Sequence, residues 1–239
     1  MFRFDYSREF LTWHLTAPGS LKQWLCGVQK EDKETKTRKL VGFISGIPVH
    51  LMIHGYEQKM VEINFLCVNS KYRTKRLAPV LIKEITRRVH NQNIWQAVYT
   101  AGVLLPKPIS KCTYYHRNIN VQKLLDVKFT YLNPKLNISR AKIIYKIAKT
   151  TTIDNVREMK KSDVDQVHYL LNNYLKKFKI HAIFSKEEIK HWFTPLDKVV
   201  YSYVVENPET LEITDFFSFY SLPSSILQQR NYKRLYLKE

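Results

Sequence analysis

The residues of this sequence that could do chemistry lie in one stretch, where an apolar strand runs into a basic turn and then a helix. The strand ends at Phe65-Leu66-Cys67-Val68, and the turn contains Arg73-Thr74-Lys75-Arg76-Leu77-Ala78-Pro79. Backbone N–H groups at the beginning of a helix, together with the helix dipole and flanking basic side chains, bind phosphate groups. The stretch therefore predicts a phosphate site, although a solvated basic turn explains the same pattern equally well.

Regular elements on either side of this turn are expected to position it. Apolar alternation predicts paired strands at 24–28 and 39–45 around a charged turn, and an interior strand at 60–68. Apolar residues on one helical face predict a helix over 78–89, and 97–100 is typical of a short buried strand. Strand, helix and strand form a βαβ unit, so we expect part of the sheet to be parallel.

The second part of the chain predicts a further set of helices and strands. We expect Ser162 to cap a helix, with Asp165 three residues on, and Ser185 to cap a second, shorter helix. Two strands should follow at 199–206 and 213–220. The chain thus repeats a strand-rich pattern that it already used in its first part.

Composition narrows the class of protein. The 239 residues include 39 Lys and Arg against 21 Asp and Glu, so the formal net charge is +18 and anionic partners are expected. A hydrophobic content of 44% excludes a disordered chain. Three cysteines argue against a disulfide framework and for a reducing compartment. We expect no signal peptide, no membrane span and no metal site, and therefore a cytoplasmic protein.

Longer motifs are similar to one known family. They lie at 1–7, 62–68, 75–89, 96–103, 105–108, 114–117 and 218–224. These segments resemble the protein N-myristoyltransferases, or glycylpeptide N-tetradecanoyltransferases, across the whole chain. The turn Arg73-x-x-Arg76-x-Ala78 is similar to the pyrophosphate loop of GCN5-related acetyltransferases, without its first glycine.

The resemblance implies an α/β (α+β) fold of the acyl-CoA N-acyltransferase type. Two acetyltransferase-like halves in tandem would occupy 1–150, which would bind acyl-CoA, and 151–239, on the peptide side. The pattern at 41–48 returns at 216–223, which agrees with a tandem repeat. Only 16 residues follow Pro223, so we expect the second unit to be incomplete.

The resemblance also implies residue roles. Backbone N–H groups of Phe65 and Leu66 would form the oxyanion hole for a thioester carbonyl. Acyl-CoA would be bound by Phe65, Leu66, Cys67, Val68, Arg73, Thr74, Lys75, Arg76, Leu77, Ala78 and Pro79. The peptide groove would be lined by Phe2, Phe4, Tyr6, Asn64, Thr100, Gly102, Tyr114, His116 and Ser224. The glycine amine of a substrate protein would attack myristoyl-CoA directly, with no metal or prosthetic group.

Taken without the resemblance, these positions have structural explanations. A cysteine on an apolar strand is usually packed, so we expect Cys67 to be packed and not a nucleophile. Phe2, Phe4 and Tyr6 alternate as core residues of a strand do, and His116 has the surroundings of a structural hydrogen-bonding histidine.

Family members differ from this chain at both ends. Upstream they carry an aromatic segment over the acyl-CoA and an acidic loop for the substrate's lysines. Downstream their C-terminal carboxylate deprotonates the glycine amine, and here the resemblance fades after Ser225. Because a positioned base contributes about 10²–10⁴ in rate, we expect catalysis by this chain to be weak or absent. We expect a monomer, with membrane contact only at its surface.

Two other functions remain open. A non-catalytic remnant would bind acyl-CoA or a partner without turnover. A basic nucleic-acid-binding protein would need aromatics interleaved with an exposed basic face, and its binding would fall steeply with salt. Most aromatic residues lie in expected strands and on core faces of helices, which disfavours nucleic acid.

Overall fold

Four strands from the first part of the chain and one from the second form a five-stranded sheet. The computed structural model describes residues 2–226. The strand order is β2-β3-β4-β5, with β7 beside β3. The strands are β2 (Leu25–Glu31), β3 (Arg38–Ile53), β4 (Tyr56–Val68), β5 (Ala97–Val98) and β7 (Ile180–Ala182). The predicted hairpin of β2 and β3 is confirmed, because these strands pair in antiparallel register from Leu25 with Ser45 to Glu31 with Arg38.

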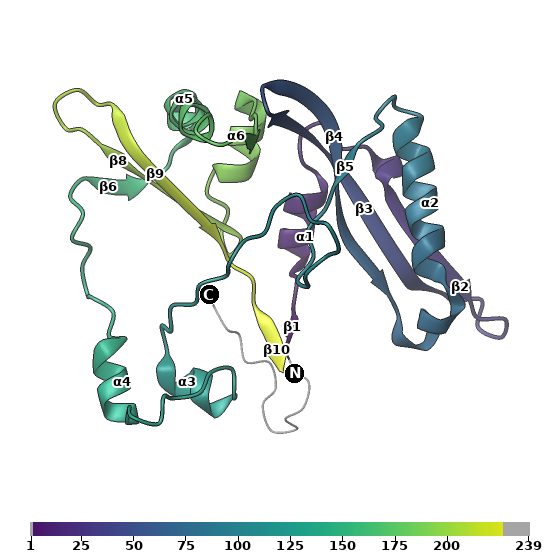
Figure 1. Ribbon diagram of the computed structural model, residues 1–239, viewed down its shortest axis with the longest axis horizontal. Helices are drawn as coiled ribbons and strands as arrows, with labels where there is room; N and C mark the ends of the chain where they lie inside the picture. The colour runs from purple at the N-terminus through teal and green to yellow at the C-terminus, as the bar shows by residue number, and fades with distance from the viewer. Residues whose placement is uncertain (1, 227–239) are drawn as a thin grey trace.

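Helix α2 (Leu77–His90) connects β4 to β5 and covers one face of this sheet (Figure 1). Its buried Leu81, Ile85 and Val89 recur at helical spacing and pack against Trp24 and Ile44. Strands β4 and β5 are parallel, so the predicted βαβ unit is confirmed. The strand predicted at 97–100 is shorter than expected and not buried. Only two of its residues pair, at the edge of the sheet, and Ala97 is exposed.

A three-stranded antiparallel sheet forms in the second part of the chain. Its order is β6 (Val156–Glu158), β8 (Val200–Glu206) and β9 (Ile213–Tyr220). Helices α5 (Val164–Leu175) and α6 (Lys186–Phe193) bury Val167 and Ile189 against Val204 and Ile213. The predicted cap of α6 is confirmed, because the Ser185 hydroxyl accepts from the Glu188 N–H at 3.2 Å and the Glu188 carboxylate accepts from the Ser185 N–H at 2.7 Å.

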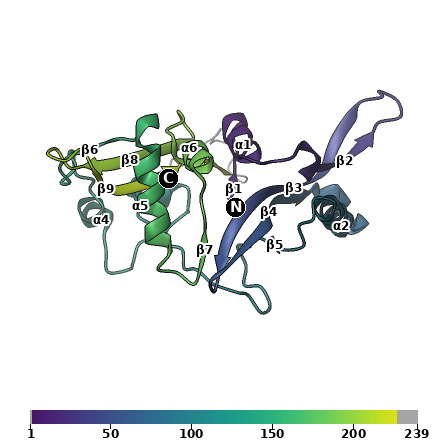
Figure 2. The ribbon, with the colours of Figure 1, turned by 90° about the horizontal axis from the view of Figure 1, so that it is seen from above.

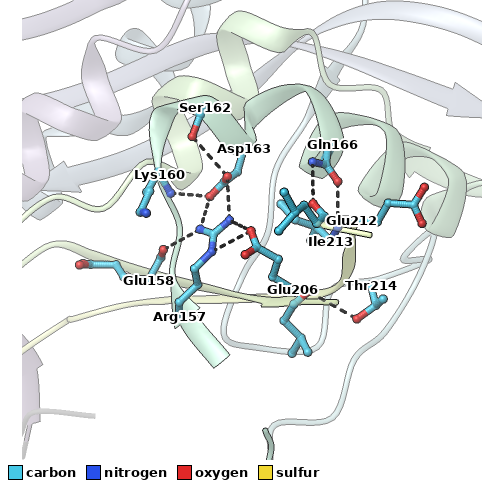
Figure 3. Close-up of polar contacts among 12 residues, drawn as sticks. Arg157, Glu158, Lys160, Ser162, Asp163, Gln166, Glu206, Glu212, Ile213 and Thr214 are labelled. Carbon is cyan, nitrogen blue, oxygen red and sulfur yellow. Dashed lines mark hydrogen bonds and ion pairs between the residues drawn. The ribbon is translucent and has the colours of Figure 1, made fainter. Parts of the chain in front are cut away.

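One arginine holds the beginning of α5 on this sheet. Arg157 of β6 donates to both carboxylate oxygens of Asp163, at 2.7 and 3.0 Å, and to Glu206 at the end of β8 (Figure 3). The prediction that Ser162 caps the helix is wrong. Asp163, and not Ser162, directly precedes α5, and its carboxylate accepts hydrogen bonds from Arg157 and from the Lys160 N–H. A carboxylate can accept from several donors at once, which a serine hydroxyl cannot do as well. We call this group the Arg157 clamp.

Three contacts join the two sheets. Strand β1 (Phe2–Phe4) pairs with β10 (Ser224–Ile226) (Figure 1), and β7 crosses from the second part of the chain to β3 (Figure 2). Helix α1 (Arg8–Leu15) lies between the sheets, and its Trp13 contacts α6. The connection from β5 to β6 carries two short helices, α3 (Val121–Asp126) and α4 (Ile138–Ile144), that pack on each other.

The predicted repeat corresponds to different structures in its two copies. The segment 41–48 lies inside β3, where Pro48 is paired with Val61 of β4. In the second copy β9 ends before Pro223, whose carbonyl accepts from the Asp5 N–H at 2.8 Å instead. Within residues 2–226, β9 pairs only with β8.

Candidate active site

A bulge in β4 lies where the family resemblance implies an oxyanion hole. The ladder with β3 pairs Phe43 with Cys67 and Ser45 with Asn64, so Phe65 and Leu66 together face a single residue and leave the regular pairing. Phe65 has φ 55°, in the left-handed region that aromatic residues rarely adopt. A non-glycine residue held there costs about 1–3 kcal/mol, and such strain concentrates at functional sites.

Neighbouring side chains hold the bulge in this conformation. The Ser45 hydroxyl donates to the carbonyl oxygen of Asn64 at 3.1 Å. The Phe65 ring packs edge-on against Tyr6, with ring centroids 5.2 Å apart, and against His14 at 4.9 Å. The backbone of the bulge is therefore fixed from both sides before any ligand arrives, as a preorganised oxyanion site requires.

The end of β4, from Leu66 of the bulge onward, opens to solvent. Leu66 is 44% exposed, and Cys67 is a free, exposed cysteine. The expectation that Cys67 is packed is therefore wrong, because the bulge shifts which residues of β4 face the core. Val68 is half-buried and packs against the core cluster under α2. An exposed apolar edge of this kind can accept an acyl or thioester group.

The basic turn carries the features of a phosphate site. After the short 3₁₀ helix Ser70–Lys75, Arg76 adopts φ 54° and α2 begins with no side chain capping its first N–H groups. Arg73, Lys75 and Arg76 are exposed, and none of the ion pairs among residues 2–226 includes them. The remaining predicted members of the turn are Thr74 and Pro79, which are exposed, and Leu77 and Ala78, which are half-buried.

A polar chain runs from β4 to α1 beside the bulge. The Asn64 amide nitrogen donates to the Glu62 carboxylate at 2.8 Å and lies 3.5 Å from Nε2 of His14. Nδ1 of His14 is buried and has no hydrogen-bond partner. Burial lowers the pKa of His14 below its usual 6.5, and Glu62 and a contact with the backbone of His14 itself offset this only in part. An unsatisfied buried polar group costs about 1–3 kcal/mol, so Nδ1 does not add to the stability that the packed ring provides.

Part of the predicted peptide groove comes together around the strands β1 and β10. Phe4 pairs with the buried Ser224, and the rings of Phe2 and His116 both contact Phe129, at 5.2 and 5.8 Å. Tyr6 and Asn64 lie at the bulge instead. Thr100, Gly102 and Tyr114 are exposed on the loop after β5.

Sequence reasoning missed His14 and Trp13, which lie on α1. Trp13 and His191 of α6 exchange hydrogen bonds: the Trp13 Nε1–H donates to the His191 carbonyl at 3.1 Å, and His191 Nε2 lies 2.8 Å from the Trp13 carbonyl. The available signal was Ser7, whose hydroxyl accepts from the Phe10 N–H at 3.0 Å and marks the beginning of α1. Phe129 was also missed, and it gave no sequence signal.

None of the helices between residues 2 and 226 combines the length and apolar composition that crossing a bilayer requires. Over the same residues, no three His, Cys, Asp or Glu side chains come together as a group that could hold a metal ion.

Comparisons with known proteins identify relatives over almost the whole chain. The family model of the myristoyl-CoA:protein N-myristoyltransferase N-terminal domain matches residues 1–112, and that of the C-terminal domain matches 126–237. The second match corrects the expectation that the resemblance fades after Ser225. A glycylpeptide N-tetradecanoyltransferase of Plasmodium falciparum is 54% identical over 235 residues, and glycylpeptide N-tetradecanoyltransferase 1 of Arabidopsis thaliana is 49% identical.

A solved structure shows the same fold. The Saccharomyces cerevisiae N-myristoyltransferase with bound myristoyl-CoA superposes with a TM-score of 0.91 at 47% identity, over 98% of this chain and 53% of that one. The predicted mixed α/β fold is thereby confirmed. The chain spans about half the length of the relatives it matches, with 56% of the Plasmodium protein and 53% of the Arabidopsis protein covered.

Proposed function

The chain belongs to the myristoyl-CoA:protein N-myristoyltransferase family, and on that premise we propose that it binds myristoyl-CoA and transfers the tetradecanoyl group to the N-terminal glycine of substrate proteins. The observation that carries the proposal is the bulge at Phe65, followed within a dozen residues by the uncapped beginning of α2. In this proposal the bulge binds the reacting carbonyl of myristoyl-CoA, and the beginning of α2 binds the phosphates of the same molecule.

The proposed chemistry assigns one task to each part of the site. Backbone N–H groups of Phe65 and Leu66 stabilise the negative charge that develops on the thioester oxygen. The N–H groups at the beginning of α2, with Arg73 and Lys75, bind the CoA phosphates. The glycine amine attacks the thioester carbon, the carbon–sulfur bond breaks, and CoA leaves as the thiol. A glycine has no side chain to collide beside the thioester.

The proposal extends to the compartment, the oligomeric state and the binding partners of the protein. We propose a cytoplasmic monomer that meets membranes only at its surface and does not bind nucleic acid. The peptide side is proposed to include Ser224 of β10, Phe4, which pairs with it, and Phe2 and His116, which contact Phe129. The division into halves at residue 150 stays a prediction.

Two measurements on the purified chain test the function. Equilibrium binding of myristoyl-CoA should be saturable, and acyl transfer to a peptide that begins with glycine should be detectable, while the same peptide beginning with alanine should remain unmodified. Saturable binding without transfer would favour the second candidate, a non-catalytic acyl-CoA-binding protein. Absence of binding would refute both.

A charge reversal tests the phosphate site separately. Arg73→Glu with Lys75→Glu should weaken myristoyl-CoA binding by about 100-fold or more, because charge-assisted hydrogen bonds contribute about 1.5–3 kcal/mol each and a factor of ten corresponds to about 1.4 kcal/mol. The matched control is Lys33→Glu with Lys36→Glu in the exposed turn between β2 and β3, which removes the same net charge. Equal weakening by both variants would mean that only the overall charge of the chain matters.

A further inference from the structure

A histidine that the mechanism above does not use lies directly behind the peptide side of the bulge. His14 is in the last turn of α1, and its ring lies between Phe65 at 4.9 Å and Trp192 at 5.7 Å. Nε2 is 3.5 Å from the amide nitrogen of Asn64. Tyr6 also contacts the Phe65 ring, and the Glu62 carboxylate lies on the other side of the Asn64 amide.

The Glu62 carboxylate determines which groups donate and which accept in the contacts among Glu62, Asn64 and His14. The atom of Asn64 that lies 2.8 Å from the Glu62 carboxylate must be the NH₂ nitrogen, because a carboxylate accepts and cannot face an amide oxygen. The same NH₂ group faces Nε2 of His14, so Nε2 must accept. The ring is therefore neutral, with its proton on Nδ1, and that buried N–H has no partner in any other residue, only a poorly aligned contact with the backbone of His14 itself.

This arrangement is costly for folding and useful for geometry. A leucine in place of His14 would fill the same space between aromatic rings without burying an unsatisfied N–H. The histidine instead gives the Asn64 side-chain amide a second hydrogen-bond acceptor besides Glu62. Each of the two N–H groups of that amide then has its own acceptor, which fixes the orientation of the side chain. Asn64 immediately precedes the bulge, and its carbonyl is already held by Ser45.

We propose that His14 is a positioning residue for the acyl acceptor: its neutral ring orients the Asn64 amide, and through it the peptide that enters beside Phe65. The proposal rests on the proposed function, because the acceptor is the glycine-initiated peptide. It concerns binding of the peptide and not of myristoyl-CoA, whose phosphate site lies beyond the other end of the bulge.

Protonation would break the arrangement. An imidazolium has two donors, and its Nε2–H would then face the Asn64 NH₂ group, which also donates. The charged groups that face His14 are Glu62 on β4, which favours the protonated ring, and His191 on α6, which disfavours it. Because burial lowers the pKa of His14 below 6.5, kcat/KM for the peptide should stay constant near pH 7 and fall only below pH 6.5.

Three variants separate positioning from packing. His14→Leu should leave the melting temperature unchanged or raise it, since the orphaned N–H is gone. The same variant should raise KM for the peptide about 5- to 10-fold, the effect of one hydrogen bond, and leave KM for myristoyl-CoA unchanged. His14→Gln can accept from Asn64 at every pH, so it should restore the peptide KM and abolish the loss below pH 6.5. His90→Leu is the matched control, because His90 also packs on a tryptophan, Trp95 at 4.3 Å, away from the site.

The outcomes distinguish this proposal from the proposed function. If the chain binds both ligands without turnover, the proposed transfer fails, and the peptide dissociation constant measured by tryptophan fluorescence replaces KM as the readout. A wild-type chain that binds no peptide overturns both proposals. A His14→Leu variant with wild-type peptide binding, or one whose weaker binding is matched by an equal loss for myristoyl-CoA and a lower melting temperature, overturns the positioning role alone.

Discussion

Removing the Arg157 clamp should destabilise the protein far more than removing a chemically similar ion pair on its surface. The five N–H donors of Arg157 are all used: two go to Asp163, two to Glu206 and one to the Glu158 carbonyl. Asp163 is only 5% exposed. Arg157→Met keeps the unbranched stem of the side chain and removes every one of these hydrogen bonds.

The size of the loss follows from burial. Breaking a fully buried ion pair costs about 3–5 kcal/mol, because one charge stays buried without its partner. Here the Arg157 and Glu206 side chains are 25% and 28% exposed, so water replaces part of what is lost. Asp163 also keeps the Lys160 N–H at 2.7 Å. We therefore expect a decrease of about 2–3 kcal/mol in the free energy of unfolding.

Urea unfolding, followed by circular dichroism and by tryptophan fluorescence, measures this difference. The matched control is Arg87→Met on α2, since Arg87 also binds one carboxylate, Glu84, through two N–H groups at 2.8 and 2.9 Å. Its side chain is 61% exposed, so the control should unfold at the wild-type urea concentration. Equal shifts for the two variants would refute the argument that burial determines the strength of the clamp.

The same clamp predicts a pH dependence. Burial alone would raise the pKa of Asp163, but Arg157 and the Lys160 N–H more than offset it, so that pKa is lowered from 3.8. A carboxylate with a lowered pKa stabilises the folded state above its unfolded pKa, and the stability is lost as pH falls through the folded value. The difference between wild type and Arg157→Met should therefore be constant above about pH 5 and shrink below 3.8.

Two further substitutions test packing and capping. Gly46→Ala would place its Cβ 2.7 Å from the buried Val61 side chain and should lower the melting temperature by about 3–10 °C. In the control Gly27→Ala, the new Cβ meets the end of the exposed Leu40 side chain, which can move away, so the melting temperature should change little. Equal transitions of the two variants in scanning calorimetry would contradict this. Ser185→Ala removes the acceptor for the Glu188 N–H and should cost about 1 kcal/mol in urea unfolding, with Ser185→Asp as the variant that keeps the cap and the stability.

Local patterns predicted the parts of the fold whose causes are local. The β2–β3 hairpin, the helix α2 and the capping box of Ser185 all follow from residues within a few positions of each other, and all are present. The errors came from tertiary contacts. Ser162 has the right residue type for a cap, but Asp163 is drawn to Arg157 on another element. Cys67 alternates as a core residue would, until the bulge moves it outward.

The candidate site shows the same division. Its basic turn could be recognised from the sequence, because a strand, a cluster of arginine and lysine and a helix are contiguous. The contact between His14 and Asn64 joins residues 50 positions apart, and the contact between Trp13 and His191 joins residues 178 apart. Contacts between residues so far apart cannot be predicted from local spacing in a single sequence, so the aromatic residues around Phe65 could be identified only from the structure.

The pairing of β1 with β10 has a consequence for how the protein is made. Phe4 and its partner Ser224 are 220 residues apart. At about 5–20 residues per second, a ribosome needs about 11–44 s to synthesise the chain between them. During that time the aromatic strand β1 has no partner, while the β2–β3 hairpin and α2 can already form. The segment that helps complete the peptide side is thus translated early and placed last, and a chaperone that binds apolar segments would have this interval in which to hold it.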